Sequence, residues 1–102
     1  MPELGSTLLQ LARNAIAAKF GLPATTPSVD HPELCIMAAT FVTLSQNGEL
    51  RGCIGSLEAW RPLFSDVQEN ARNAAFRDPR FEPLAEAELL ITRVEVSLLT
   101  PA

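Results

Sequence analysis

The pair Asn47-Gly48 places the strongest constraint on how this chain of 102 residues folds. It lies between two runs rich in β-forming residues, TFVTLS at 40–45 and LRGCIG at 50–55. Both Asn and Gly tolerate the positive φ of a type I′ turn, so such a pair between apolar runs is a strong local signal for a hairpin. We therefore predict a β-hairpin over about 40–55 with Asn47-Gly48 as its two-residue turn.

That turn also predicts how the two strands pair. Counting outward from it gives these opposite residues: Leu50 and Ser45, Arg51 and Leu44, Gly52 and Thr43, Cys53 and Val42, Ile54 and Phe41. Because side chains alternate across a strand, Arg51 and Cys53 become neighbours on one face. Gly52 then lies on the other face, where the missing side chain lets a ligand or another backbone approach closely.

The residues on either side of the hairpin supply two helices and one more strand. Apolar residues at helical spacing, with Ser6 as an N-cap, predict a helix over about 6–20. A second helix over about 61–76 has Pro62 in its first turn and its own apolar stripe. Alternation over about 91–99 predicts a half-buried strand. This order of elements predicts an α+β fold in which helices pack on an antiparallel sheet.

Composition narrows the class of protein. The chain is long enough for one small domain. A net charge of −4 and a pI near 4.8 argue against unaided nucleic-acid binding, because neutralising phosphates needs surplus Lys and Arg. No apolar run reaches membrane-spanning length and no signal peptide is visible, so we expect no membrane association. Two cysteines are too few for a disulfide framework, which favours a reduced, cytoplasmic protein.

The basic residues are unusual in kind, since seven of the eight are Arg. Four of them fall near LRGCIG, the end of the second helix and the DPRF stretch, namely Arg51, Arg72, Arg77 and Arg80. One interpretation is an anion pocket in which planar guanidinium groups grip a phosphate or carboxylate. The other is a set of internal ion pairs, Arg80 with Asp78 or Glu82 and Arg72 with Glu69.

Cys53 is the one candidate nucleophile with a motif around it. Arg51 on the same strand face would lower the pKa of its thiol, whereas the competing interpretation is a packing or ligand-lining residue, because Cys is among the most buried residue types. A Cys-based transfer site also needs a base, normally His, and the one His is His31. The spacing of His31, Cys35 and Cys53 matches no zinc pattern, so we predict no metal site and no cofactor. For Trp60 we prefer a hydrophobic staple ahead of the second helix over a partner anchor.

Three stretches of the chain carry a resemblance to a known family. FVTLSQNGELRGCIGSLE, PLFSDVQENARNAAFRDPRFEPL and ELLITRVEVSLL together resemble the AMMECR1 domain family over residues 40–100. The resemblance implies an α+β fold around an antiparallel sheet and leaves the biochemical activity open. It also implies a place in the AmmeMemoRadiSam set, with a Memo-like protein and a radical SAM protein as companions.

Members of that family usually continue well beyond the VSLL strand. The resemblance therefore implies that residues 1–102 form a single AMMECR1-like domain that is partial or shortened, with an exposed sheet edge through which copies of the chain associate. We expect a non-catalytic accessory or regulatory domain that binds a ligand or partner at an LRGCIG cleft. That cleft is predicted to include Arg51, Gly52, Cys53, Gly55, Arg77, Asp78 and Arg80. The alternative is an enzyme with Cys53 as nucleophile and Arg51 as its stabiliser, and the sequence leaves this choice open.

Overall fold

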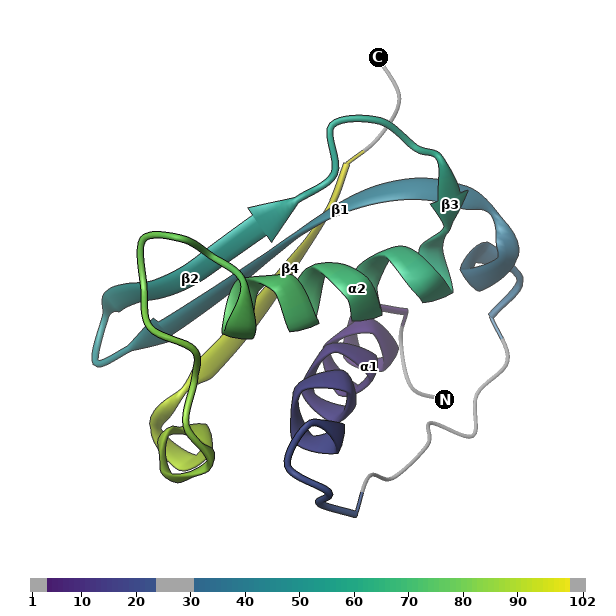
Figure 1. The fold of residues 1–102 in the computed structure, drawn as a ribbon. Helices are drawn as coiled ribbons and strands as arrows, with labels where there is room; N and C mark the ends of the chain where they lie inside the picture. Colours follow the sequence, from purple (N-terminus) through teal and green to yellow (C-terminus); the bar gives the residue numbers. More distant parts are fainter. Residues whose placement is uncertain (1–3, 24–30, 100–102) are drawn as a thin grey trace.

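The computed structural model describes residues 4–23 and 31–99, so most of the Pro-rich stretch 22–33, which the sequence predicts as a loop, lies outside the described residues. Two α-helices, two 3₁₀ helices and four strands make up the described chain (Figure 1). In order they are α1 (Leu4–Ala18), η1 (Pro32–Cys35), β1 (Met37–Gln46), β2 (Glu49–Gly55), β3 (Arg61–Pro62), α2 (Leu63–Phe76), η2 (Glu86–Ile91) and β4 (Arg93–Leu99).

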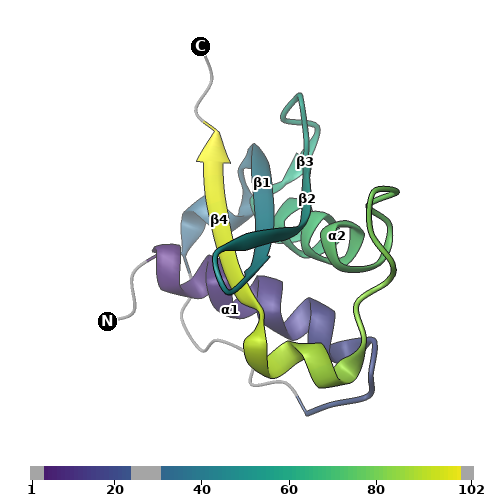
Figure 2. The ribbon, with the colours of Figure 1, turned by 90° about the vertical axis from the view of Figure 1, so that its left-hand side faces the viewer.

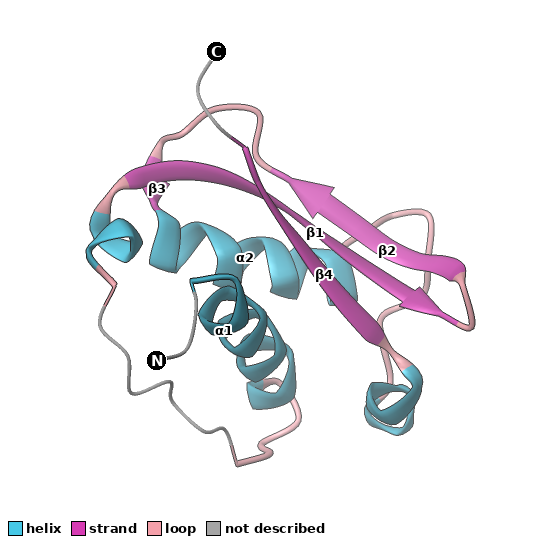
Figure 3. Cartoon of the chain, turned by 180° about the vertical axis from the view of Figure 1, so that it is seen from behind, coloured by secondary structure: helices cyan, strands magenta, loops and turns pink. Residues whose placement is uncertain are grey.

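Strand β1 is the centre of an antiparallel sheet. It pairs with β2 along one side and with β4 along the other, while the two-residue β3 pairs with Met37 and Ala38 at its beginning. Both helices pack on one face of this sheet. In Figure 1 α2 lies in front of β4, and in the opposite view of Figure 3 β4 crosses in front of α2. The predicted α+β class with its antiparallel sheet is confirmed.

The core lies between the two helices and the sheet face that they cover. Its buried apolar members from the helices and the central strand include Leu8, Ile16, Val42, Leu44, Leu63, Val67, Ala71 and Ala74. The helix α2 carries three fully buried alanines, Ala71, Ala74 and Ala75. Alanines occupy little space, so α2 lies close against the sheet, beside β1 and β2 (Figure 2).

The predicted turn of the hairpin is confirmed. Asn47 and Gly48 have φ angles of 53° and 81°, the positive values that favour these two residue types. Gln46 pairs with Glu49 and Ser45 with Leu50, as a two-residue turn requires.

Beyond Leu50 the predicted pairing is wrong, because Arg51 forms a β-bulge. Leu44 pairs with Gly52 instead of Arg51, Thr43 with Cys53 instead of Gly52, Val42 with Ile54 instead of Cys53, and Phe41 with Gly55 instead of Ile54. Without the bulge, the Arg51 side chain would lie on the core face beside Leu44, where a buried guanidinium is costly. With one extra residue in β2, Gly52 occupies that face and Cys53 moves to the opposite one.

Three local predictions also change at the helix ends. Ser6 lies inside α1, which begins at Leu4, and so is not its N-cap. Pro62 is the N-cap of α2 rather than a residue of its first turn, because Arg61 and Pro62 pair with β1. The staple predicted at Trp60 is wrong, since its side chain is 65% exposed and its ring lies over the guanidinium of Arg61.

Candidate functional site

The bulge places Cys53 in a polar row across the sheet face that lies away from the helices. Thr43 of β1 pairs with Cys53 of β2 on one side and with Glu95 of β4 on the other. The Cys53 Sγ and the Thr43 Oγ1 are 3.4 Å apart, within hydrogen-bond distance for a sulfur atom. Among the residues that the structure describes, no helix covers this row. The thiol is therefore half-buried by its neighbours on the sheet and not by the core.

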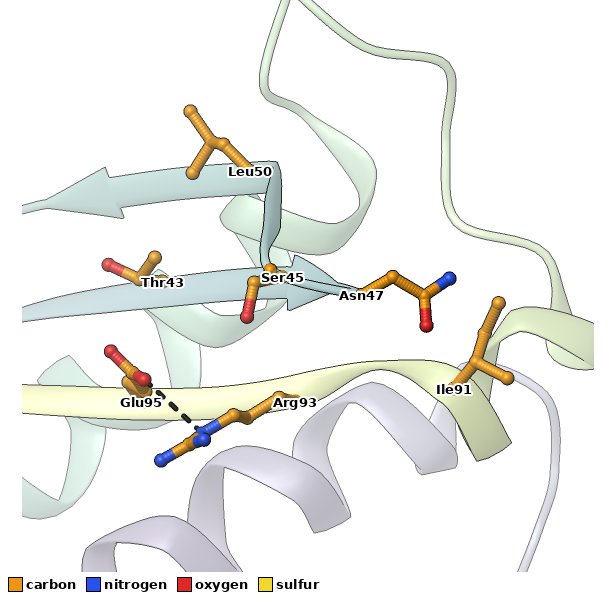
Figure 4. A pocket seen from close by; sticks show the side chains of 8 residues that line it. Thr43, Ser45, Asn47, Leu50, Ile91, Arg93 and Glu95 are labelled. Carbon is orange, nitrogen blue, oxygen red and sulfur yellow. Dashed lines mark ion pairs between the residues drawn. The ribbon is translucent and has the colours of Figure 1, made fainter.

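A shallow hollow of about 430 Å³ lies on the same sheet face toward the hairpin turn (Figure 4). Thr43, Ser45 and Leu50 line it from the hairpin, and Arg93 and Glu95 line it from β4. The Arg93 Nε and the Glu95 Oε1 form an exposed ion pair 3.2 Å long. The hollow thus adjoins the Cys53–Thr43–Glu95 row through the two residues that they share.

Asp78 joins the DPRF stretch to the LRGCIG strand. Its Oδ2 accepts a hydrogen bond of 3.0 Å from the backbone N–H of Cys53, a donor on the outer edge of β2. The Arg80 guanidinium donates to both Asp78 oxygens, at 3.0 Å and 2.8 Å. These bonds, with that from Arg80 first, hold the pKa of the buried Asp78 carboxyl far below its usual value. The Asp78 carboxylate thus satisfies a backbone donor at the open edge of β2.

Arg51 has a parallel role at the other end of β2. Its Nε and Nη2 donate to the two Glu88 oxygens of η2 at 2.9 Å and 3.1 Å. This bidentate pair, helped by Ala85 N–H and Gln46, lowers the pKa of Glu88 to about 2. Arg51 and Arg80 also approach the same Phe81 ring, at 5.9 Å and 5.4 Å from its centre. The DPRF loop and η2 therefore join four of the predicted site residues, namely Arg51, Cys53, Asp78 and Arg80.

The space beside each of the two glycines of LRGCIG is occupied by other atoms of this chain. A Cβ on Gly52 would clash with the backbone carbonyl oxygen of Ala74 in α2. A Cβ on Gly55 would lie 2.5 Å from the Phe41 ring on the paired strand. The close approach predicted at Gly52 thus exists, and its occupant is a helix of this chain.

Sequence reasoning missed a buried polar network around Asp66. Its fully buried carboxylate accepts hydrogen bonds from the Ser56 hydroxyl at 2.6 Å, the Arg61 Nε at 2.7 Å and the Thr40 hydroxyl at 2.8 Å, besides the Thr40 backbone N–H and the Asn70 amide. Burial alone would raise the pKa of Asp66, but these bonds outweigh it and hold the pKa below its usual value. The sequence signal was slight, since an Asp in the first turn of a helix is ordinary.

The remaining candidates lie on α2, at its C-cap and on or beside η1. Arg72 pairs with Glu69 at 2.9 Å on α2, as the internal interpretation predicts. Arg77 is exposed at the C-cap of that helix, and His31 lies 3.8 Å from Glu33 beside η1. Cys35 is exposed. Within the described ranges 4–23 and 31–99, no three His, Cys, Asp or Glu side chains gather as a metal site would need, and no helix is long and apolar enough to cross a membrane.

The chemistry open to Cys53 follows from these partners. The Thr43 hydroxyl can donate a hydrogen bond to a thiolate. The hydrogen bond to Asp78 raises the pKa of Arg80, so this guanidinium stays charged and paired with that carboxylate. A nucleophile also needs a base to take up its proton. Within the described part of the chain, the one hydrogen-bond partner of the Cys53 Sγ is the Thr43 hydroxyl, which is no base at neutral pH.

The chain is similar to proteins from several archaea. Protein SSO0193 of Saccharolobus solfataricus is 42% identical over 103 residues, which cover 96% of this chain and 45% of that one. A protein of Methanothermobacter thermautotrophicus is 42% identical over 95% of this chain and 52% of its own. The crystal structure of the uncharacterized protein PH0010 from Pyrococcus horikoshii matches with a TM-score of 0.82 and 38% identity, over 95% of this chain and 51% of that one.

This chain thus spans about half the length of the relatives that it matches. The AMMECR1 family model matches residues 9–102, which include the LRGCIG strand, the DPRF loop, all of α2 and most of α1. The match takes in nearly the whole described fold, including the first helix. The chain belongs to the AMMECR1 family.

Proposed function

We propose that this chain is a non-catalytic accessory domain that binds a protein partner through the sheet face bearing Cys53. The observation that carries this proposal is that the charged groups of LRGCIG and DPRF are paired with carboxylates of this chain. Arg51 is paired with Glu88 and Arg80 with Asp78, so neither pair has a net charge to offer an anionic ligand, and of the Arg51 nitrogens only the buried Nη1 lacks a hydrogen-bond partner within the described residues. The motif residues stiffen the sheet that presents Cys53.

The surface left for a partner is the row of Cys53, Thr43 and Glu95 with the hollow beside it. It mixes a soft thiol, a hydroxyl and an exposed ion pair, which suits recognition of a polar polypeptide surface. The companions that the family resemblance implies, a Memo-like protein and a radical SAM protein, are the first partners to test.

A matched pair of variants tests this proposal. Ser45 lines the hollow, whereas Ser65 is exposed on α2, on the other side of the sheet. With purified companions and isothermal titration calorimetry, we expect Ser45→Arg to weaken binding roughly tenfold or more, because a long cation fills the hollow, while Ser65→Arg leaves it unchanged. Binding that is insensitive to Ser45→Arg, or no binding of either companion, contradicts the proposal.

One observation favours the alternative of a Cys53-dependent enzyme. The Thr43 hydroxyl, 3.4 Å from the Cys53 Sγ, is suited to donate a hydrogen bond to a thiolate. Labelling of the native protein with iodoacetamide across pH separates the two functions. Labelling of Cys53 ahead of the exposed Cys35 below neutral pH supports the enzyme, and labelling of Cys35 first supports the binding domain.

A further inference from the structure

A second surface, separate from the Cys53 face, is an apolar groove lined in part by the last two residues of β4. Figure 1 shows the end of β4, at the top of the sheet in that view. The groove has a volume of about 640 Å³. Its floor and walls include Leu63 at the start of α2, Ile36 and Met37 before and in β1, Leu57 in the connection from β2 to β3, and Leu98 and Leu99 of β4. None of the LRGCIG residues lines it. We name it the Leu57 groove.

The apolar side chains around the Leu57 groove are unusually open to solvent. Leu57 is 93% exposed, Ile36 60% and Met37 57%, and Leu98 and Leu99 are also exposed. An exposed leucine alone is ordinary, but contiguous apolar side chains around a concave surface mark a site of association.

The segment that carries Leu57 is held in place at both ends by one buried carboxylate. Ser56, just before it, donates its hydroxyl to the Asp66 Oδ1 and its backbone N–H to the Thr40 carbonyl oxygen. Arg61, just after Trp60, donates its Nε to the same Asp66 oxygen. A loop of four residues anchored in this way presents Leu57 with little conformational freedom left to lose, and such preorganisation favours binding.

The charge at the groove indicates the chemistry of its occupant. Among the described residues, two carboxylates, Glu33 and Glu58, line it, and no Lys or Arg does. Within the described residues Glu58 forms no ion pair, and Glu33 has only His31 at 3.8 Å. A second copy of this chain, with its net charge of −4, would bring four carboxylates together, and an anionic lipid surface would be repelled. A basic segment has the opposite charge.

We propose that the Leu57 groove binds an amphipathic segment of a partner protein, one that inserts apolar side chains against Leu57 and Met37 and presents a Lys or Arg to Glu58. Apolar area supplies the affinity and the charge pair selects basic over acidic segments. This site is independent of the Cys53 face, so either proposal stands if the other fails.

Fluorescence anisotropy tests the proposal with labelled amphipathic peptides that have Leu on one face and either Lys or Glu on the other. We expect the Leu/Lys peptide to bind with saturation at one site and the Leu/Glu peptide to bind at least roughly tenfold more weakly. Leu57→Ser and Glu58→Lys should each weaken the Leu/Lys peptide roughly tenfold.

Matched controls distinguish this groove from general attraction to an acidic protein. Leu90 is 96% exposed and Glu86 is exposed, both on η2 and outside the groove, so Leu90→Ser and Glu86→Lys should bind like the unmodified chain. Equal losses in the controls, or no binding of the Leu/Lys peptide, overturn the proposal. The proposal is also overturned if sedimentation shows a dimer that Leu57→Ser dissociates. It is overturned as well if the groove binds no peptide but does bind the half of a longer relative that this chain does not match, when that half is added as a separate protein.

Discussion

Replacing Gly52 with alanine tests whether LRGCIG is built for packing or for a ligand. The added methyl group would point from β2 toward α2 and overlap the carbonyl oxygen of Ala74, with the Ala74 carbonyl carbon at 3.1 Å. These atoms belong to the backbone of a helix whose neighbouring residues are fully buried, so they cannot move aside as a side-chain end can. The substitution therefore forces α2 away from the sheet.

The expected cost follows from that geometry. Overpacking a buried site typically costs about 1–3 kcal/mol, and a backbone obstacle favours the upper end. For a domain of about 100 residues, a loss near 3 kcal/mol lowers the melting temperature by roughly 12–24 °C. Gly55→Ala should cost less, about 1 kcal/mol, because the Phe41 ring that it meets is a side chain able to shift.

Gly5→Ala is the matched control. No atom lies within 4 Å of the position where its Cβ would be, and the residue is in α1, where alanine is favoured over glycine. Urea unfolding followed by circular dichroism should rank the stabilities as Gly52→Ala lowest, Gly55→Ala next and Gly5→Ala at or above the unmodified chain. If Gly52→Ala melts within about 2 °C of the unmodified chain, a change well under 1 kcal/mol, while losing partner binding, the packing argument is refuted and the glycine serves a ligand.

Four further substitutions test the polar contacts. Asp66→Ala should cost about 3–5 kcal/mol in urea unfolding, because it leaves buried donors unpaired, whereas Glu69→Ala removes a surface pair worth about 1 kcal/mol or less. Glu88 has its pKa lowered from 4.5 to about 2, so its contribution to stability is present above pH 4.5 and is lost as the pH falls toward 2; Glu88→Gln should flatten the decline in unfolding free energy over that window. Asp78→Ala should speed hydrogen exchange of the Cys53 amide, measured by NMR, beyond the change in global stability, and an unchanged rate would show that the contact is dispensable.

The parts of the fold that follow local rules were predictable. The turn at Asn47-Gly48 and the presence and approximate position of the two main helices and the last strand all depend on residues near one another in sequence, although the helix ends differ by up to two residues from those predicted. The register beyond Leu50 was not predictable in this way. It depends on Gly52 meeting Ala74 and on Arg51 reaching Glu88, and both contacts join segments that only the tertiary fold brings together.

In the candidate site, too, only contacts between residues near one another in sequence were predictable. The internal interpretation offered Arg80 two possible partners, Asp78 and Glu82, and the structure pairs it with Asp78. The sequence did not predict that Asp78 bonds to the backbone of Cys53, nor that Thr43 lies beside the thiol. Pairing partners on neighbouring strands depend on register, and one extra residue changes every pair beyond it. A single-residue bulge thus separates the predicted Val42–Cys53 pair from the observed Thr43–Cys53 pair.

The bulge also indicates why Arg51 stands in the strand. In a hairpin without Arg51, Leu50 would still pair with Ser45, and the next residues, Gly52 and Cys53, would pair with Leu44 and Thr43 by ordinary alternation. Every other residue of the motif would keep its face, so the extra residue is not needed for the sheet itself. What it adds is the bidentate bond to Glu88, which ties the edge strand to η2 just before β4 begins. The arginine that the sequence presents as a partner of the thiol is therefore better understood as the link that holds both outer strands of the Cys53 face in register.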